Sequence, residues 1–188
     1  MKKEFMEALE VSPVIAAVKD EAGLEKCILY DSQIVFILYG DITTIPEIVK
    51  KIKEVGKIAM VHIDLITGLS SKEIAVDFIK SNTLADGIIT TKPNLIKRAG
   101  ELGLYTVLRL FLIDSMAFDN LERQVKAAKP DVVEILPGLM PKIVSKVCKR
   151  LPIPVIASGF ISDKEDIISV LRAGATCVSS SNENIWCV

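Results

Sequence analysis

The sequence predicts a compact (β/α)₈ barrel, and two features of its pattern carry that prediction. Apolar runs of strand length alternate with stretches of helical periodicity, and eight such pairs follow one another along 188 residues. The last two runs lead into the glycine and serine clusters Ser158-Gly159 and Ser179-Ser180-Ser181. Loops after strands 7 and 8 of a barrel commonly bind phosphate. An open doubly wound sheet is the alternative, but eight units in so short a chain favour one barrel domain over residues 1–188.

The first two units contain fully apolar strands, as expected for parallel strands that are buried on both faces. Residues 3–10 are predicted to form a short helix that covers the bottom of the barrel. Pro13 precedes the first strand, 14–18, and a helix over 24–30 follows. Residues 34–38 are predicted to form the second strand.

Capping residues mark the helices of the next two units. Thr44 is expected to cap the helix after the second strand, and Gly56 to end it. The third strand is predicted over 57–64. Ser70 and Glu73 then have the spacing of a capping box and should open the following helix.

Turn residues bound the fourth to sixth units. Pro93 and Gly103 suit the start and the end of one helix, and Asp114 or Ser115 should cap the next. The predicted strands and helices of these units are, in order, 87–90, 94–102, 104–112, 115–128, 132–136 and 140–150.

The last two units contain the strongest signal for a ligand. A strand over 153–158 turns at Gly159 into a helix over 163–172, with Ser162 and Glu165 spaced as a capping box. A strand over 175–178 and a short helix over 182–188 end the chain. Such junctions present backbone N–H groups and small hydroxyls to an anion. We therefore predict that a phosphate contacts Gly159, Ser179 and Ser180.

Composition argues against several other classes of protein. Lysine plus arginine number 23 and aspartate plus glutamate 24, so the balance of charge does not itself indicate a nucleic-acid-binding protein. The four cysteines form no Cys-x-x-Cys pair and there is one histidine, so we expect no metal site. Dispersed cysteines and apolar runs no longer than a strand indicate a cytoplasmic protein outside the membrane.

Charged residues occur at or near the carboxyl ends of the predicted strands, where barrels place their functional groups. They are Lys19, Asp64, Lys92, Arg109 and Glu134. Two carboxylates and three cations would partly neutralise one another and leave positive charge beside the phosphate loops. We expect all five near the ligand, with Asp64 the strongest candidate for a functional residue.

Each of these residues also has a structural interpretation. Arg109 and Glu134 lie on neighbouring strands and could form a buried ion pair. Lys19 and Lys92 could be solvated loop residues. His62, two residues before Asp64, is expected to be a hydrogen-bonded core histidine rather than an acid or base.

Two helices carry clusters of cations that could either be solvated or contact nucleic acid. The candidates for RNA binding are Lys50, Lys51, Lys53 and Lys57. A second cluster is Lys142, Lys146, Lys149 and Arg150. A homodimer would widen a basic surface, although no apolar stripe in the sequence indicates one.

Several motifs in one order along nearly the whole chain carry a family resemblance. They are SPVIAAVKD at 12–20, HIDL at 62–65, GLSSKE at 68–73, ADGIITTK at 85–92, LIDS at 112–115, EILPGLMP at 134–141, the two terminal junctions, and Trp186. Together they resemble the GlpP family, the glycerol-3-phosphate-responsive antiterminators of glycerol-utilisation operons.

The resemblance implies a transcription regulator without a cofactor, not an enzyme. Such a protein would bind glycerol 3-phosphate and act on leader mRNA to prevent early termination. By position, the phosphate would meet Gly159, Ser179 and Ser180, with Asp64 and Lys92 near the glycerol end. The alternative is a barrel enzyme on a small phosphorylated substrate, with Asp64 as general acid or base and Lys92 as its electrostatic partner or as a Schiff-base former.

Overall fold

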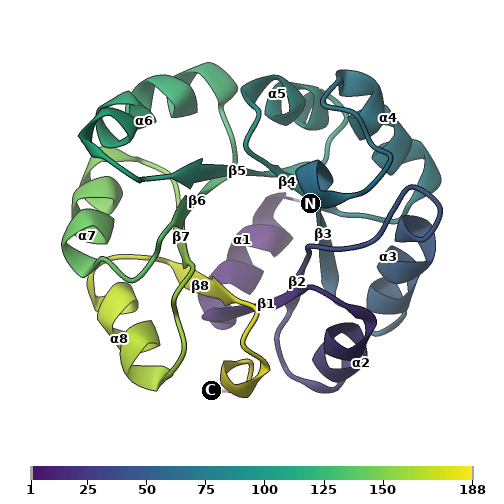
Figure 1. The fold of residues 1–188 in the computed structure, drawn as a ribbon, viewed down its shortest axis with the longest axis horizontal. Helices are drawn as coiled ribbons and strands as arrows, with labels where there is room; N and C mark the ends of the chain where they lie inside the picture. Colours follow the sequence, from purple (N-terminus) through teal and green to yellow (C-terminus); the bar gives the residue numbers. More distant parts are fainter. Residues whose placement is uncertain (1, 188) are drawn as a thin grey trace.

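Eight parallel strands close into a barrel, with helices around its outside (Figure 1). This computed structural model describes residues 2–187. Neighbours along the chain are neighbours in the sheet, and the last strand pairs with the first. The strands are β1 Val14–Val18, β2 Ile34–Ile37, β3 Ile58–His62, β4 Gly87–Thr90, β5 Tyr105–Phe111, β6 Val132–Leu136, β7 Val155–Ser158 and β8 Cys177–Ser180. The predicted (β/α)₈ barrel is confirmed.

The helices follow the strands in regular alternation after one N-terminal helix. They are α1 Lys2–Val11, α2 Glu21–Leu29, α3 Ile45–Glu54, α4 Glu73–Asn82, α5 Pro93–Glu101, α6 Ser115–Ala128, α7 Pro141–Arg150 and α8 Lys164–Arg172. Two short 3₁₀ helices are η1 Ile63–Leu65 and η2 Glu183–Ile185.

The strands bury both of their faces, which produces two shells of core. One shell packs between strands and helices, and a smaller one fills the barrel with side chains such as Phe36, Met60 and Ile156. Gly87 shows how tightly the interior packs. A Cβ there would lie 2.4 Å from the carbonyl oxygen of Tyr105 and 2.7 Å from the Met60 side chain, so only glycine fits.

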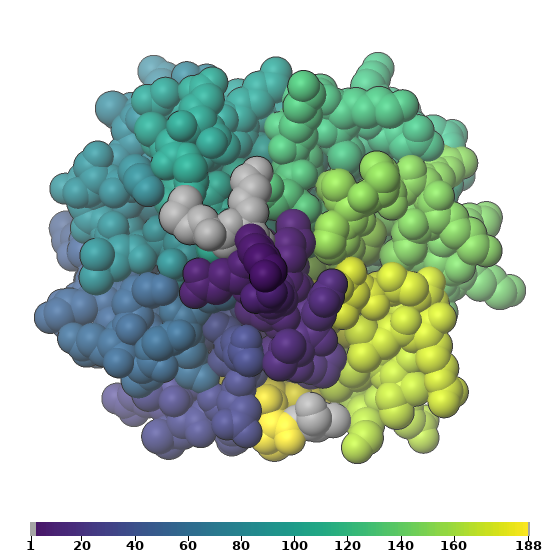
Figure 2. All heavy atoms as spheres, turned by 180° about the vertical axis from the view of Figure 1, so that it is seen from behind, coloured from purple at the N-terminus to yellow at the C-terminus, as the bar shows by residue number. Residues whose placement is uncertain are grey.

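Helix α1 closes the bottom of the barrel, as predicted. Seen from behind, this purple segment lies over the centre of the molecule (Figure 2). Phe5 and Leu9 are buried with the interior shell, and the Phe5 ring stacks on Tyr105 with a centroid separation of 4.7 Å. The opposite, open end therefore holds the loops that could bind a ligand.

Two predicted strand boundaries are wrong in ways that affect the site. The last strand begins at Cys177 and continues to Ser180, so both serines pair with β1 rather than follow the strand. Their hydroxyls find buried hydrogen-bond partners, which allows the strand to continue. The third strand ends at His62, which places Asp64 on η1.

Both predicted capping boxes are also wrong. Helix α4 begins after Lys72, which makes no side-chain capping bond. At α8 the cap is Asp163, which accepts a hydrogen bond from the Asp166 backbone N–H at 2.9 Å. Ser162 instead donates to the Asp166 carboxylate. Asp114, by contrast, caps α6 as predicted.

Candidate functional site

A cavity of about 260 Å³ opens at the carboxyl ends of β7 and β8. Four residues singled out from the sequence line it: Arg109, Gly159, Ser179 and Ser180. Its other lining residues are Ala17, Leu38, Leu136, Ser158, Phe160, Ile161, Ser181 and Asn182. The chain therefore brings the two glycine- and serine-rich junctions together around one small space.

The loop after β7 turns through two residues with left-handed backbone. Gly159 has φ +84°, a conformation that favours glycine, and Phe160 follows with φ +62°. This turn leaves Phe160 at the cavity with 79% of its residue surface exposed. Sequence analysis did not identify Phe160 or Ser158 as site residues, although both adjoin the Ser-Gly junction that signalled the loop.

The N-terminus of α8 is less available to an anion than the sequence suggested. Asp163 accepts a hydrogen bond from the Asp166 N–H of the first turn, and Asp166 accepts one from the Ser162 N–H just before it. Their negative charge would oppose a second anion there. A phosphate in the cavity would therefore depend on the Gly159 turn, the serine hydroxyls and Arg109.

A buried polar network forms one wall of the cavity. The Arg109 guanidinium binds Glu134 through Nε at 2.6 Å and through Nη2 at 3.2 Å. Ser179 Oγ donates to the same carboxylate at 3.1 Å, and Ser158 Oγ lies 3.2 Å from Ser179 Oγ. The ion pair anticipated for Arg109 and Glu134 is present. Glu134 does not line the cavity but holds two groups that do.

Arg109 retains donors for a ligand. Glu134 engages Nε and Nη2, and Nη1 makes no hydrogen bond within residues 2–187. A guanidinium binds phosphate oxygens well because its N–H groups lie in one plane.

Asp64 lies in a second cluster, with the loop after β4. It accepts hydrogen bonds from Thr90 Oγ1 at 2.8 Å, from the Thr91 N–H at 2.8 Å, from Thr91 Oγ1 at 2.9 Å and from Lys92 Nζ at 3.0 Å. Burial opposes ionisation, but these hydrogen bonds outweigh it and lower the pKa of Asp64. Asp64 and Lys92 pair with each other and do not line the 260 Å³ cavity.

His62 is buried, with 3% of its surface exposed. The structure departs from the expected hydrogen-bonded histidine, because Nδ1 has no hydrogen-bond partner in the described part of the chain. Burial, with a contribution from nearby Arg109, lowers the pKa of His62 to about 4, against the opposite influence of Glu134 and Asp64. The imidazole is therefore neutral at pH 7.

Lys19 is exposed beside the cavity. It borders an open recess with Ser181, Asn182, Glu183 and Asn184, two of which also line the cavity. Its position is compatible with a contact to a ligand at the mouth.

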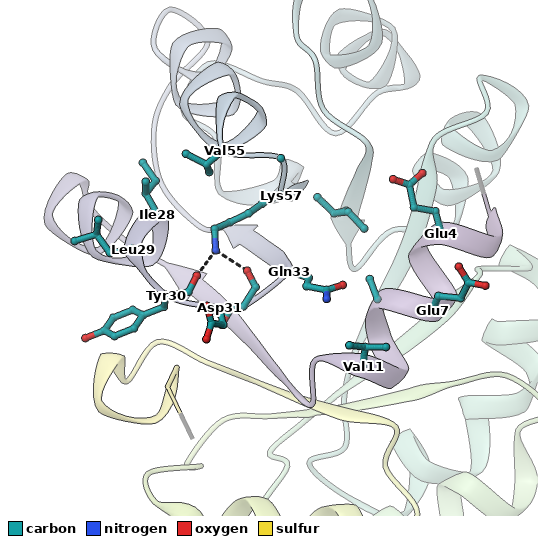
Figure 3. Close-up of a pocket in the computed structure, with 14 residues that line it drawn as sticks. Glu4, Glu7, Val11, Ile28, Leu29, Tyr30, Asp31, Gln33, Val55 and Lys57 are labelled. Carbon is teal, nitrogen blue, oxygen red and sulfur yellow. Dashed lines mark hydrogen bonds between the residues drawn. The ribbon is translucent and has the colours of Figure 1, made fainter.

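The four lysines predicted to bind RNA already interact with neighbouring carboxylates or backbone carbonyl oxygens. Lys51 lies 2.5 Å from Glu21, Lys53 lies 2.7 Å from Asp86, and Lys50 lies between Glu47 and Glu54 at 3.7 and 3.9 Å. Lys57 is buried and donates to the carbonyl oxygens of Tyr30 and Ser32 in a recess at the bottom of the barrel (Figure 3). Their contact with RNA stays a prediction.

Other kinds of site find little support in the structure. Residues 2–187 contain no group of three or more histidine, cysteine, aspartate or glutamate side chains placed to hold a metal ion. None of the helices in this range has the length and apolar character that a membrane crossing needs.

Known proteins resemble this chain over almost its whole length. It is 44% identical over 182 residues to the uncharacterized protein YgcP of Escherichia coli K12, covering 97% of this chain and 95% of that protein. The glycerol uptake operon antiterminator regulatory protein of Listeria monocytogenes is 34% identical, with a TM-score of 0.89 over 92% of this chain and 94% of that structure.

A glycerol uptake operon antiterminator-related protein of Thermotoga maritima is 32% identical, with a TM-score of 0.83 over 94% of this chain and 99% of that one. The family described as glycerol-3-phosphate responsive antiterminator matches residues 14–186. That range includes every strand and both serine-rich junctions of the cavity. The chain belongs to the glycerol-3-phosphate responsive antiterminator (GlpP) family.

Proposed function

We propose that this protein is a transcription antiterminator that binds glycerol 3-phosphate and, in response, the leader mRNA of glycerol-utilisation genes. Membership of the family supports the regulatory role. The observation that carries the ligand assignment is the 260 Å³ cavity, where Arg109 meets the Gly159 turn and three consecutive serines. Acting on leader mRNA would place the protein in the cytoplasm.

The chemistry of the cavity suits a small phosphorylated ligand. Arg109 supplies a cation. The Ser179 and Ser180 hydroxyls donate to Glu134 and to the Ile161 carbonyl oxygen, so each would have to release that acceptor before it could donate to a phosphate. Because Glu134 already neutralises one face of Arg109, a phosphate would compete with that carboxylate or bind the free Nη1. We expect the phosphate at Nη1 and the serine junctions, with the glycerol part toward the mouth near Lys19.

The response to ligand would arise at the turn after β7. Gly159 and Phe160 both line the cavity, and Phe160 is also largely exposed to solvent. A ligand that binds one arrangement of this turn more tightly than another would shift the population toward that arrangement. RNA affinity would change if the favoured arrangement is also the one that binds RNA.

The test is calorimetric titration of glycerol 3-phosphate into wild-type protein and two glycine variants. Gly159→Leu introduces a side chain at the cavity and strains a residue with φ +84°. Gly56→Leu is the matched control, because φ there is +76° and a Cβ would meet nothing within 4 Å. Either substitution should cost about 1 to 2 kcal/mol of stability through backbone strain.

We expect selective, saturable heat with wild type and Gly56→Leu, and at least a tenfold weaker affinity with Gly159→Leu. Glycerol and inorganic phosphate serve as ligand controls. Equal affinity in all three proteins would reject the cavity as the binding site. No binding to wild type would reject the ligand.

An enzyme acting through Asp64 and Lys92 is the second candidate, since these two groups form an ion pair near the open end. The four hydrogen bonds to Asp64 and its lowered pKa make it a weak general base. Phosphorus NMR of glycerol 3-phosphate incubated with the protein tests the point. We expect an unchanged spectrum; a new signal that is lost in Asp64→Asn would favour the enzyme.

A further inference from the structure

Helix α7 carries cations on one side and no carboxylates. Lys142, Lys146, Lys149 and Arg150 are all exposed, and their spacing places them along one face of the helix. No aspartate or glutamate occurs anywhere between Glu134 and Asp163. The face therefore concentrates positive charge in a protein whose formal net charge is only -1.

The cations of α7 form fewer ion pairs than those of α3. Within the described chain, Lys142, Lys146 and Lys149 form no ion pair, and Arg150 lies 3.9 Å from an exposed Asp119 carboxylate. On α3, each lysine faces a carboxylate within 4 Å. Counterions rather than protein groups must therefore balance the lysines of α7, and release of counterions drives binding to polyanions.

A groove of mixed polarity lies next to this charged face, lined by residues of α6, of α7 and of the segment before α6. Helices α6 and α7 are neighbours on the outside of the barrel (Figure 1). Its volume is about 440 Å³, and it is lined by Leu112, Ile113, Asp114, Ser115, Phe118, Asp119, Met140, Ile143 and Lys146. Of the two carboxylates, Asp114 accepts the capping hydrogen bond of α6 and Asp119 lies 3.9 Å from Arg150. The Arg150 guanidinium lies over the Phe118 ring, 4.3 Å from its centroid. An aromatic ring and apolar side chains beside cations match what an unstacked base and its backbone phosphates require.

The groove also has a backbone connection to the ligand cavity. The loop between β6 and α7 passes against β7, where the Gly138 N–H donates to the Ser158 carbonyl oxygen at 2.5 Å. A Cβ at Gly138 would lie 2.5 Å from the Ser158 backbone nitrogen, so this approach requires glycine. Two residues later, Met140 lines the groove. A change at Ser158 and Gly159 would therefore be felt at the start of α7.

We infer that the α7 face and the groove between α6 and α7 are the surface that contacts single-stranded RNA, in place of the lysines around α3. This inference rests on the proposed function, because it assigns the surface for the proposed RNA partner. The cations would follow the phosphates, and a base would enter the groove beside Phe118.

The test measures the anisotropy of a fluorescein-labelled single-stranded oligouridine over a range of salt concentrations, with saturating glycerol 3-phosphate and without it. The two variants, matched in charge, are Lys142→Gln/Lys146→Gln/Lys149→Gln on α7 and Lys50→Gln/Lys51→Gln/Lys53→Gln on α3. Thermal unfolding and calorimetry with glycerol 3-phosphate check that each variant is folded and binds its ligand. If the α3 variant does not fold, Lys50→Gln/Lys51→Gln is compared with Lys142→Gln/Lys146→Gln.

We expect the α7 variant to bind RNA at least tenfold more weakly, and the slope of log affinity against log salt to fall by about 2 for three lost contacts. The α3 variant should match wild type. Unchanged binding by the α7 variant, or equal losses in both variants, would overturn the surface assignment while the proposed function stands. A different outcome is that wild-type protein binds glycerol 3-phosphate but binds neither this oligomer nor a transcribed leader RNA. That result would overturn both the proposed function and the surface assignment. An acidic protein would then be the partner that fits the surface.

Discussion

At the scale of single residues, Glu134 shows how the barrel keeps a charge in its interior. The side chain has no exposed surface, yet Arg109 and Ser179 both donate hydrogen bonds to it. A buried carboxylate without partners would be costly, whereas a well-paired one is tolerated. The network also orients Arg109 and Ser179 toward the cavity.

Loss of one partner should therefore destabilise the protein more than loss of both. We expect Arg109→Met to lower the free energy of unfolding by about 3 kcal/mol or more, because Glu134 would remain buried and unpaired. The double variant Arg109→Met/Glu134→Gln should recover part of that loss. Urea denaturation measures both, and a double variant less stable than the single one would contradict this account.

His62 offers a direct measurement, because it is the only histidine in the chain. Its pKa is lowered from 6.5 to about 4, chiefly by burial. Proton NMR of the untagged protein should show one imidazole, whose Cε1 and Cδ2 ring protons both titrate near pH 4. Titration near pH 6.5 would mean that the ring is solvated.

The same shift affects stability. In the unfolded chain His62 takes up a proton near pH 6.5, but in the native protein it does so only near pH 4. The free energy of unfolding should thus be unaffected by His62 above pH 6.5 and should fall by roughly 3 kcal/mol between pH 6.5 and 4. The variant His62→Gln isolates this contribution, since it should lack that part of the pH dependence.

At the scale of elements, α1 contributes to the interior as well as to the surface. Phe5 is fully buried and stacks on Tyr105, so the helix acts as a plug at the bottom of the barrel. We expect Phe5→Ala to cost about 3 to 5 kcal/mol, as for other buried phenylalanines.

Val11→Ala is the control from the same helix, because Val11 is 68% exposed. It should change stability by less than about 0.5 kcal/mol. Guanidinium denaturation compares the two variants. Equal small effects would show that α1 is not packed into the barrel in solution.

At the scale of the whole molecule, the proposed ligand binding would be coupled to folding. The cavity is built from segments as far apart as Ala17 and Asn182, and it exists only in the closed barrel. A ligand that binds the native state alone stabilises it by about 2.7 kcal/mol at a concentration 100 times its Kd. Glycerol 3-phosphate should therefore raise the Tm of the wild type, whereas glycerol at the same concentration should not.

The variant Gly159→Leu gives the contrast for this measurement. It should keep a cooperative transition but lose the shift in Tm with ligand. A Tm shift as large as that of the wild type would mean that the stabilising site lies elsewhere.

The sequence alone determined the barrel, because parallel strands buried on both faces must be apolar throughout and their connecting helices must be amphipathic. Both are local patterns, visible in strands such as 14–18 and 34–37 and in the helix over 45–54. The Ser-Gly junction at Gly159 was also visible locally, because a left-handed turn between a strand and a helix favours glycine.

The tertiary structure decided which polar groups are free and which are occupied. Lys53 meets Asp86, Lys57 turns inward to Tyr30 and Ser32, and Asp64 is saturated by the loop after β4. Among residues 2–187, the lysines of α7 have no such partners. No local sequence pattern separates a paired lysine from an unpaired one. Each pairing joins segments that are remote in the chain, and only closure of the barrel brings those segments together.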